Sequence, residues 1–267
     1  MPAIPDVTPR PAATLLLLRD GAAALEVLMI TRHADTAFAG GALVFPGGRV
    51  DNADSAPEML RACRVATQVD AIEMAFRIAA IRETFEEAHV LLARAKGEEG
   101  LLTGKALAAL EQGLAARLDH APSFAEIVGS GAIELATELL VLFGHWITPK
   151  GRSKRFDTLF FLAPAPPDQV AAHDGHEAVD SVWVTPAAAV AAADAHRASL
   201  VFATRMNLMR LGQNRDVAAA LAAAQASRIV PICPELYETA SGWRIRIPSD
   251  LGYSPADMPA AEVFVPR

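Results

Sequence analysis

Residues 82–87 read Arg82-Glu83-Thr84-Phe85-Glu86-Glu87, and they lie inside a long apolar segment that follows Asp70. On a helix, Glu83 is three and four positions from Glu86 and Glu87, so all three carboxylates project to one side. Three like charges this close repel one another unless a hard cation lies between them, and Mg²⁺ and Mn²⁺ prefer oxygen ligands. A solvated acidic helix face is the alternative. The apolar character of the segment favours the metal site, as does a separate Gly47-Gly48 loop that would let the backbone approach a phosphate.

The sequence before residue 46 has patterns that predict short strands. Thr14–Arg19 and Leu25–Thr31 flank a turn at Asp20-Gly21, which predicts a hairpin of two largely buried strands. Ala42–Phe45 predicts a third strand, which ends in a loop at Pro46-Gly47-Gly48.

The helix that carries the carboxylates is expected to run unbroken over Ala71–Ala93. Asp70 is its predicted N-cap, with Glu73 as the capping-box partner. Its expected apolar stripe consists of Ile72, Phe76, Ala79 and Ala80.

The rest of the chain alternates between sequence patterns that predict helices and patterns that predict strands. Residues 97–138 predict a helical insertion that covers the core, with Ser123 as a helix cap. The elements expected after it are strands at Leu139–Thr148, Phe156–Ala163 and Val179–Val184, a helix Ala187–Ala193 capped by Thr185-Pro186, two helices within 198–226, and short strands within Ile229–Ile247.

Composition excludes several classes of protein. The chain has 24 Lys and Arg against 31 Asp and Glu, a net charge of −7, which argues against a dedicated nucleic-acid binder. Apolar runs such as Leu15–Leu18 are far shorter than the roughly 20 residues of a membrane span, and no secretion signal is visible. Cys63 and Cys233 fit neither a metal spacing nor a disulfide framework. We therefore expect a cytoplasmic protein with no membrane partner.

Gly48-x5-Asp54 followed by Arg82-Glu83-Thr84-Phe85-Glu86-Glu87-Ala88-His89-Val90 resembles the Nudix box, G-x5-E-x7-R-E-U-x-E-E-x-G-U, where U is a bulky apolar residue. Here 27 residues separate Asp54 from Arg82 where the usual box has seven. This split box is similar to a long-form Nudix subgroup that includes peroxisomal coenzyme A diphosphatases. The resemblance implies an α/β fold, the Nudix-type α/β/α sandwich with a mixed sheet, here with an additional helical insertion.

Three positions depart from the box. Asp54 replaces its first glutamate, Thr84 replaces an apolar residue, and His89 replaces the glycine that turns the chain out of the helix. Because histidine tolerates positive φ better than most residues, we expect His89 to be a strained but workable exit. The domain organisation expected is a single Nudix hydrolase domain over 1–267. Its additions are a box insertion near 55–75, the helical insertion at 97–138 and a helical C-terminal extension from about 195.

The resemblance also implies roles for particular residues. Glu83, Glu86 and Glu87 would be ligands of Mg²⁺ or Mn²⁺, with Glu83 alternatively a general base and Arg82 orienting it. Gly47 and Gly48 would form the loop that places the helix. The alternative for Arg82 is a surface ion pair with Glu86. The alternative for the two glycines is an ordinary turn that ends a strand.

Two further residues are candidates on position. Glu177, in a loop before a strand, is a candidate general base or extra ligand, and a solvated loop glutamate is its alternative. Arg155 is the best placed of a basic loop to bind a substrate phosphate, and that loop could equally be solvated.

These roles imply hydrolysis of a diphosphate linkage in a nucleoside diphosphate derivative. Coenzyme A or acyl-coenzyme A is favoured, since Arg32, Gly41 and Phe45-Pro46-Gly47-Gly48 match the register of a pattern found in Nudix enzymes that act on coenzyme A. The match is partial, because Ala37 replaces its second arginine and His33 its serine or alanine. The alternatives are an ADP-ribose or dinucleotide pyrophosphatase, and a non-catalytic Nudix-like nucleotide-binding module. A homodimer is left open.

Overall fold

The predicted N-terminal hairpin forms the centre of the fold. The computed structural model describes residues 7–33, 40–64, 69–172 and 178–260. In it β1 (Arg10–Asp20) pairs antiparallel with β2 (Leu25–Arg32), with Leu18 opposite Val27. Both strands are slightly longer than predicted, and their hairpin is confirmed.

These two strands lie inside a mixed sheet of eight strands. Its main path is β10-β7-β8-β1-β2-β3, with β4 also paired to β1 and β9 to β2. The β1/β8 and β10/β7 pairs are parallel, and the other pairs are antiparallel. The remaining strands of this sheet are β3 (Leu43–Val44), β4 (Gly47–Arg49), β7 (Val141–Ile147), β8 (Phe156–Pro164), β9 (Ala178–Val184) and β10 (Pro231–Ile232).

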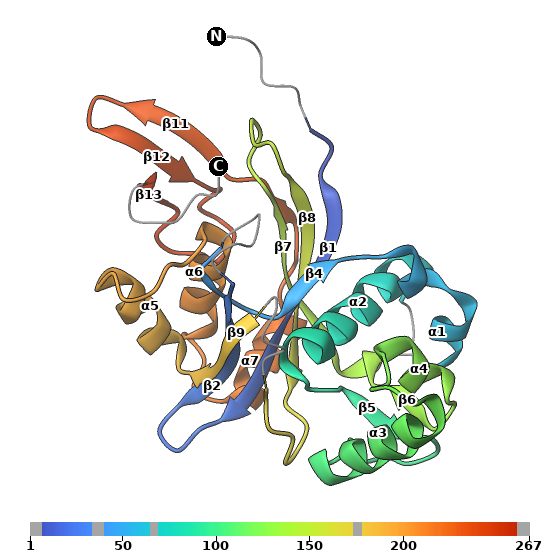
Figure 1. Cartoon of the computed structure of the whole chain (residues 1–267). Coiled ribbons are helices and arrows are strands. Elements are labelled where there is room, and N and C mark those ends of the chain that lie inside the picture. Colours follow the sequence, from blue (N-terminus) through green and yellow to red (C-terminus); the bar gives the residue numbers. More distant parts are fainter. Residues whose placement is uncertain (1–6, 34–39, 65–68, 173–177, 261–267) are drawn as a thin grey trace.

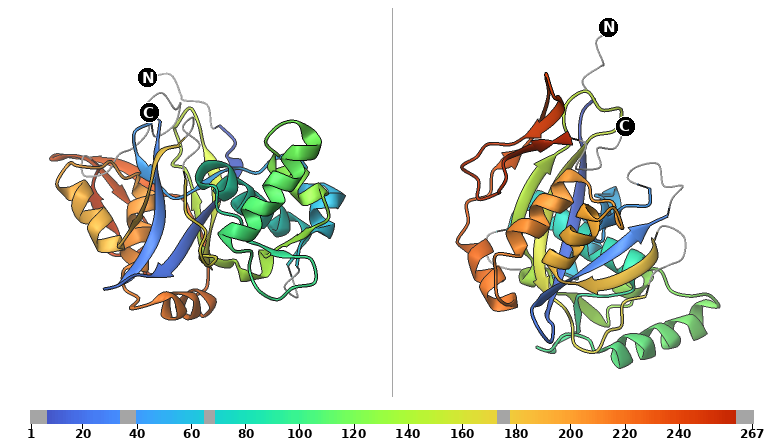
Figure 2. Two further views of the ribbon diagram at one scale, coloured as in Figure 1. Left: turned by 60° about the horizontal axis from the view of Figure 1, so that its bottom comes forward. Right: turned by 90° about the vertical axis from the view of Figure 1, so that its left-hand side faces the viewer.

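The continuous apolar run of β1 is explained by burial on both faces of the sheet. Leu15 and Leu17 belong to a core shared with α2 (Ala71–Ala88), whereas Leu16 and Leu18 belong to a second core on the opposite face. The second core includes α5 (Pro186–Asp194), α6 (Phe202–Leu211) and α7 (Val217–Gln225). Helices thus cover both faces of the sheet (Figures 1 and 2), which confirms the predicted α/β/α sandwich.

The helix α2 begins where predicted and ends earlier. The Asp70 side chain accepts a hydrogen bond from the backbone N–H of Glu73, but the Glu73 carboxylate binds Arg77 and does not complete a capping box. The helix stops at Ala88, not Ala93, because His89 adopts the left-handed conformation with φ 54° and ψ 32°. The expected positive-φ exit at His89 is therefore confirmed, and its strain stays a prediction.

Two local predictions about this region were wrong. Ile72, placed on the apolar stripe, is 73% exposed because it lies in the first turn of α2, away from the core. The Gly47-Gly48 segment is not a loop but the short strand β4, which pairs with β1 through Gly47 opposite Thr14 and Gly48 opposite Ala13. A Cβ on Gly47 would lie 2.5 Å from the carbonyl oxygen of Ala13, so only glycine allows this approach.

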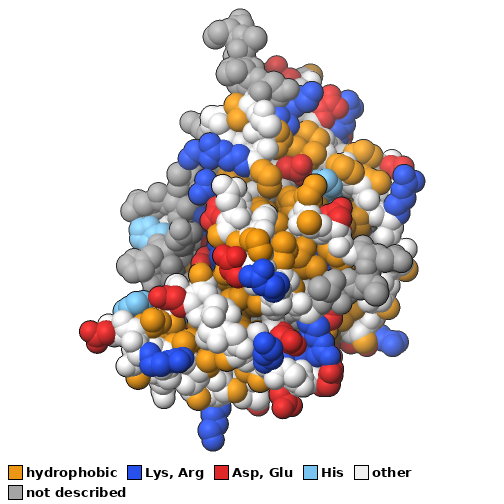
Figure 3. All heavy atoms as spheres, turned by 90° about the vertical axis from the view of Figure 1, so that its right-hand side faces the viewer, with side chains coloured by type: hydrophobic (Ala, Val, Ile, Leu, Met, Phe, Trp, Pro, Cys, Tyr) orange, Lys and Arg blue, Asp and Glu red, His pale blue; other side chains and the backbone are white. Residues whose placement is uncertain are grey.

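The insertion at 97–138 is mostly helical, as predicted, and Ser123 caps its second helix in a capping box with Glu126. Its helices are α3 (Gly104–Leu118), α4 (Phe124–Gly129) and the 3-10 turn Thr137–Leu139, while β6 (Ile133–Leu135) pairs with β5 (Ala93–Ala95) in a small sheet that was not predicted. On the side of the molecule that this insertion covers, acidic and basic side chains are interspersed (Figure 3).

The C-terminal segment packs on the other side of the sheet. The predicted cap Thr185 and the N1 proline Pro186 begin α5, and the two helices expected within 198–226 are α6 and α7. A separate antiparallel sheet follows, made of β11 (Glu235–Thr239), β12 (Gly242–Arg246) and β13 (Asp257–Pro259). Across the described ranges, no helix combines the length and the apolar character needed to cross a bilayer.

Candidate active site

Arg82 is the hub of the acidic cluster on α2. One of its nitrogens, Nη1, donates to Oε1 of Glu83 at 2.8 Å and to Oε2 of Glu86 at 2.9 Å. The other, Nη2, donates to the backbone carbonyl of Arg49 at 2.9 Å, which ties the helix to β4. Because Glu83 and Glu86 share a single donor atom, their carboxylates converge on one point beside the helix.

Asp54 holds the other side of the Arg82 guanidinium. It lies in the 3-10 turn Asn52–Ser55, is 1% exposed, and accepts from Nε and Nη2 of Arg82 at 2.9 and 3.0 Å. Burial lowers the pKa of Arg82, but the hydrogen bonds that Arg82 donates to Asp54 and the negative charge of Glu83 outweigh this effect and hold that pKa above its ordinary value. Arg82 therefore stays charged, and Asp54 fixes its orientation.

Glycine at position 48 lets the Glu83 carboxylate lie against the backbone of β4. A Cβ built on Gly48 would lie 2.4 Å from Cδ of Glu83 and 2.5 Å from each carboxylate oxygen. No side chain fits there without moving Glu83, so the sequence at 47–48 serves the acidic cluster directly.

Glu87 is buried and turned toward the start of β4. Its Oε2 accepts from the backbone N–H of Gly47 at 2.8 Å, and its Oε1 lies 3.7 Å from Nη1 of Arg32 on β2. The structure therefore brings together every site residue predicted on α2, β4 and β2, although Glu87 faces Gly47 and Arg32 while Glu83 and Glu86 face Arg82.

The donor set suits a hard divalent cation that is completed by other ligands. In the part of the chain that is described, no three His, Cys, Asp or Glu side chains converge closely enough to hold a metal ion by themselves. Mg²⁺ is commonly held by one or two carboxylates together with waters and substrate phosphate oxygens. Two converging carboxylates, Glu83 and Glu86, match that requirement.

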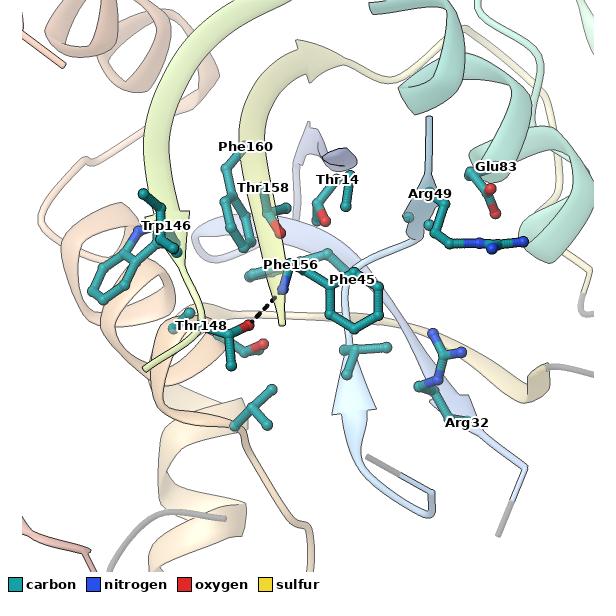
Figure 4. A pocket seen from close by; sticks show the side chains of 18 of the residues that line it. Thr14, Arg32, Phe45, Arg49, Glu83, Trp146, Thr148, Phe156, Thr158 and Phe160 are labelled. Atoms are coloured by element: carbon teal, nitrogen blue, oxygen red, sulfur yellow. Dashed lines mark hydrogen bonds between the residues drawn. The ribbon is translucent and has the colours of Figure 1, made fainter. Parts of the chain in front are cut away.

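These residues line a cavity of about 600 Å³, within the range of small-molecule sites. Arg32, Arg49 and Glu83 lie on one side of it, and Trp146, Phe156 and Phe160 lie on the other (Figure 4). Arg82, Glu86, Glu87, Gly47 and Gly48 also line it. The cavity thus joins the acidic cluster to an aromatic wall supplied by β7 and β8.

Sequence reasoning missed two parts of this cavity. Arg49 follows the glycine pair directly, is exposed, and lies beside Glu83 (Figure 4), and its position next to Gly48 was the available signal. Trp146 and Phe160 lie on predicted apolar strands and are 3% and 6% exposed, as core residues are, yet both also line the cavity.

Of the predicted site residues, Arg155 is not brought to this cavity and Glu177 lies outside the described residues. Arg155 is buried and donates to the backbone carbonyls of Thr148 and Val7 at 3.1 and 2.8 Å, and it is not among the residues that line the cavity. Its guanidinium thus binds two backbone carbonyls, whereas the sequence predicted that it binds a substrate phosphate. Glu177 lies outside the described residues, so its proposed role stays a prediction.

Comparison with known proteins agrees with the fold. Residues 64–202, more than half of the chain, match the family model of the NUDT19 Nudix domain, and the chain belongs to the Nudix hydrolase family. A crystal structure of a Nudix hydrolase from Alicyclobacillus acidocaldarius superimposes with a TM-score of 0.65 at 26% identity, covering 81% of this chain and 96% of that one. The protein is accordingly an α/β enzyme of the Nudix hydrolase class.

Within that class, the chain is similar to NUDT19. It is 30% identical to the acyl-coenzyme A diphosphatase NUDT19 of Gallus gallus over 210 residues, covering 62% of this chain and 55% of the relative. It is 26% identical to putative nudix hydrolase 7 of Caenorhabditis elegans over 214 residues, covering 80% of this chain and 64% of the relative. The chain thus spans less than two thirds of the length of either relative.

Proposed function

We propose that the protein hydrolyses the diphosphate linkage of coenzyme A or an acyl-coenzyme A with the help of a divalent cation. The observation that carries this proposal is the cavity in which Arg82 holds two carboxylates together at one end, beside two further arginines, Arg32 and Arg49. A diphosphate carries negative charge on both phosphorus centres, so a site that hydrolyses it needs positive charge and a base in close proximity.

The residues of the cavity have distinct roles in this proposal. Arg32 and Arg49 bind the non-bridging phosphate oxygens through charge-assisted hydrogen bonds. Glu83 and Glu86 hold the cation, Mg²⁺ or Mn²⁺, which neutralises phosphate charge and acidifies water when bound. Glu87, bonded to Gly47, keeps β4 against α2 and would become a third ligand if it turned away from that amide.

The reaction requires one water and releases two phosphate monoesters. A water oxygen attacks one phosphorus in line with the bridging oxygen, the new P–O bond forms, and the P–O bond to the bridge breaks. Glu83 accepts the proton of the attacking water, and the bridging oxygen leaves with the second phosphate. With coenzyme A, the products are 3′,5′-ADP and 4′-phosphopantetheine. Glu177 is the alternative base.

Two observations support coenzyme A over ADP-ribose as substrate. One is the partial pattern at Arg32, Gly41 and Phe45–Gly48, in which Arg32 lies in the cavity. The other is the similarity to a relative named acyl-coenzyme A diphosphatase, although the chain covers 55% of that protein.

A substrate panel tests the proposal. Coenzyme A, an acyl-coenzyme A, ADP-ribose and a dinucleoside polyphosphate are incubated with Mg²⁺ or Mn²⁺, and the products are identified by mass. We expect coenzyme A and the acyl-coenzyme A to be cleaved with a higher kcat/KM than ADP-ribose or the dinucleoside polyphosphate, and we expect this cleavage to be lost in Glu83→Gln. Glu58→Gln, on the exposed face of α1 (Pro57–Arg61), is the matched control and should leave turnover unchanged.

Each other result rejects a specific part of the proposal. A preference for ADP-ribose would reject the coenzyme A assignment and retain the chemistry. Full activity of Glu83→Gln would reject the role of that carboxylate. Absence of hydrolysis across the panel, with binding retained, would favour a non-catalytic nucleotide-binding module.

A further inference from the structure

Among the described residues that line the cavity, charge is confined to one end. Its charged lining residues are on β2, β4, α2 and the turn after β4: Arg32, Arg49, Asp51, Arg82, Glu83, Glu86 and Glu87. The lining residues contributed by β7, β8, α6 and the C-terminal strands carry no charge: Trp146, Ile147, Thr148, Pro149, Phe156, Thr158, Phe160, Val201, Phe202, Ala203, Thr204, Pro234 and Ile245. A ligand that fills this cavity therefore has a charged part and a neutral, largely apolar part.

The uncharged end is closed by the first turn of α6. Val201, the N-cap, and the next three residues all line the cavity, and within the described ranges no side chain caps this helix. The first backbone N–H groups of a helix have no partner within the helix, so this turn offers hydrogen-bond donors in otherwise apolar surroundings. The uncharged end therefore suits apolar chain interrupted by carbonyl oxygens.

The same end is poorly suited to a nucleobase. Trp146 is 3% exposed, and the rings of Phe202 and Tyr253 pack perpendicular to it at 6.0 and 5.1 Å, so little of its face is left for stacking. The Thr148 hydroxyl accepts from the backbone N–H of Phe156 at 3.0 Å. A purine needs a free aromatic face and polar partners for its ring nitrogens, and this wall supplies little of either.

A phosphate group is also poorly matched there. The first turn of a helix can bind an anion. However, no Lys or Arg of the described residues lines this end of the cavity, and a phosphate dianion placed among Phe156, Ile245 and Pro234 would lose hydration without a compensating charge.

We propose that the uncharged end of the cavity, closed by the first turn of α6, is a subsite for the acyl-pantetheine arm of an acyl-coenzyme A. This assignment rests on the proposed function and deepens it, because it separates the acylated arm from the nucleotide. The amide and thioester carbonyls of the arm accept hydrogen bonds from the α6 turn, and the acyl chain packs on the apolar wall of β7, β8 and β12. The segment after residue 200 thereby selects the substrate, while α2 carries the chemistry.

Ala203 gives the sharpest test of this subsite. It lines the cavity from the first turn of α6 and is only partly buried, so Ala203→Leu adds bulk at the uncharged end, away from Glu83. Ala222→Leu, on the exposed face of α7, adds the same side chain outside the cavity and is the matched control. The ligands are coenzyme A, octanoyl-coenzyme A, 3′-dephospho-coenzyme A and ADP-ribose.

Binding and turnover are measured separately. Dissociation constants are obtained by calorimetry with Mg²⁺ in a Glu86→Gln background, which prevents turnover, and kcat/KM is obtained with Glu86 intact. Each buried methylene should improve binding by up to about fourfold, so we expect octanoyl-coenzyme A to bind at least tenfold more tightly than coenzyme A. Ala203→Leu should remove most of that gain and lower kcat/KM for octanoyl-coenzyme A several-fold more than for ADP-ribose. Ala222→Leu should change neither.

Each other outcome contradicts either the subsite or the reaction. Binding that is independent of the acyl chain, or absent for all four ligands, would overturn the subsite, as would an equal loss on every ligand in Ala203→Leu. If Ala203→Leu removed only the advantage of coenzyme A over its 3′-dephospho form, the α6 turn would bind phosphate and the subsite would be wrong. Acyl-dependent binding without cleavage by the parent enzyme would keep the subsite and reject the proposed function.

Discussion

Replacing Asp54 with asparagine tests whether the buried Arg82 pair organises the site. Asp54 is 1% exposed, makes two hydrogen bonds to Arg82 at 2.9 and 3.0 Å, and also accepts from the backbone N–H of Asp51 at 2.8 Å. Removing one partner of a buried ion pair costs about 3–5 kcal/mol, because the other charge is left uncompensated. Arg82 keeps Glu83 and Glu86, so we expect a loss near the lower limit, about 3 kcal/mol.

The assay is thermal and urea unfolding followed by circular dichroism, together with kcat/KM on the best substrate. A loss of about 3 kcal/mol corresponds to a fall in Tm of about 6–10 °C for a chain of this size. Because Arg82 would be free to turn further toward Glu83 and Glu86, kcat/KM should fall at least about tenfold. Asp51→Asn is the control, since that side chain is 56% exposed and 3.9 Å from Arg82, and it should shift stability by under about 1 kcal/mol. Equal stability of Asp54→Asn and the parent would refute the reasoning.

Four other perturbations follow from the same structure. Glu86→Gln should abolish turnover but shift Tm by under about 3 °C, since the side chain is 46% exposed, and parental turnover would refute its role in holding the cation. His89→Gly should be more stable to urea than His89→Ala by about 1 kcal/mol, because both lose the ring and only alanine keeps a Cβ at φ 54°; the opposite order would contradict the strain. Arg155→Ala should lower Tm yet leave the ratio of kcat/KM for coenzyme A and ADP-ribose unchanged, and a selective loss on coenzyme A would restore the phosphate contact predicted from the sequence. Burial raises the pKa of the Cys63 thiol to about 11. The stability that the protonated thiol contributes should therefore be present below pH 9 and decline between about pH 9 and 11. A Cys63→Ser variant that shows the same alkaline decline would argue against this contribution.

The parts of the fold that could be predicted from the sequence are those with a local signal. The apolar runs on either side of Gly21 specify β1 and β2, and the spacing of Glu83 and Glu86 places both on one side of α2. The αL exit at His89 could be expected from the glycine that it replaces in the box. In each case the determining interactions lie within a few residues of one another along the chain.

The parts that could not be predicted depend on contacts between distant segments. Gly47-Gly48 is typical of a loop by composition, but the backbone of β1 and the Glu83 carboxylate approach it so closely that glycine is needed for a strand. The uncharged end of the cavity brings together Trp146, Phe202 and Ile245, which are more than forty residues apart in sequence and share no sequence pattern. The burial of Arg155 could not be predicted because a basic loop is usually solvated, whereas this guanidinium is buried on the backbone carbonyls of Thr148 and Val7.

The insertion that splits the box and the insertion at 97–138 contact each other. Asp54 and Arg82 are in direct contact although 27 residues separate them, so the added segment leaves the site and returns to it. That segment bonds to the insertion at 97–138: Arg64 and Ala62 exchange backbone hydrogen bonds with Leu135 at 2.9 and 2.7 Å. Phe124 of α4 in turn packs 6.2 Å from Phe85, inside the run of residues that carries the carboxylates. The two insertions therefore form one structural unit against the buried face of α2, and the opposite, C-terminal side of the sheet is left to shape the cavity.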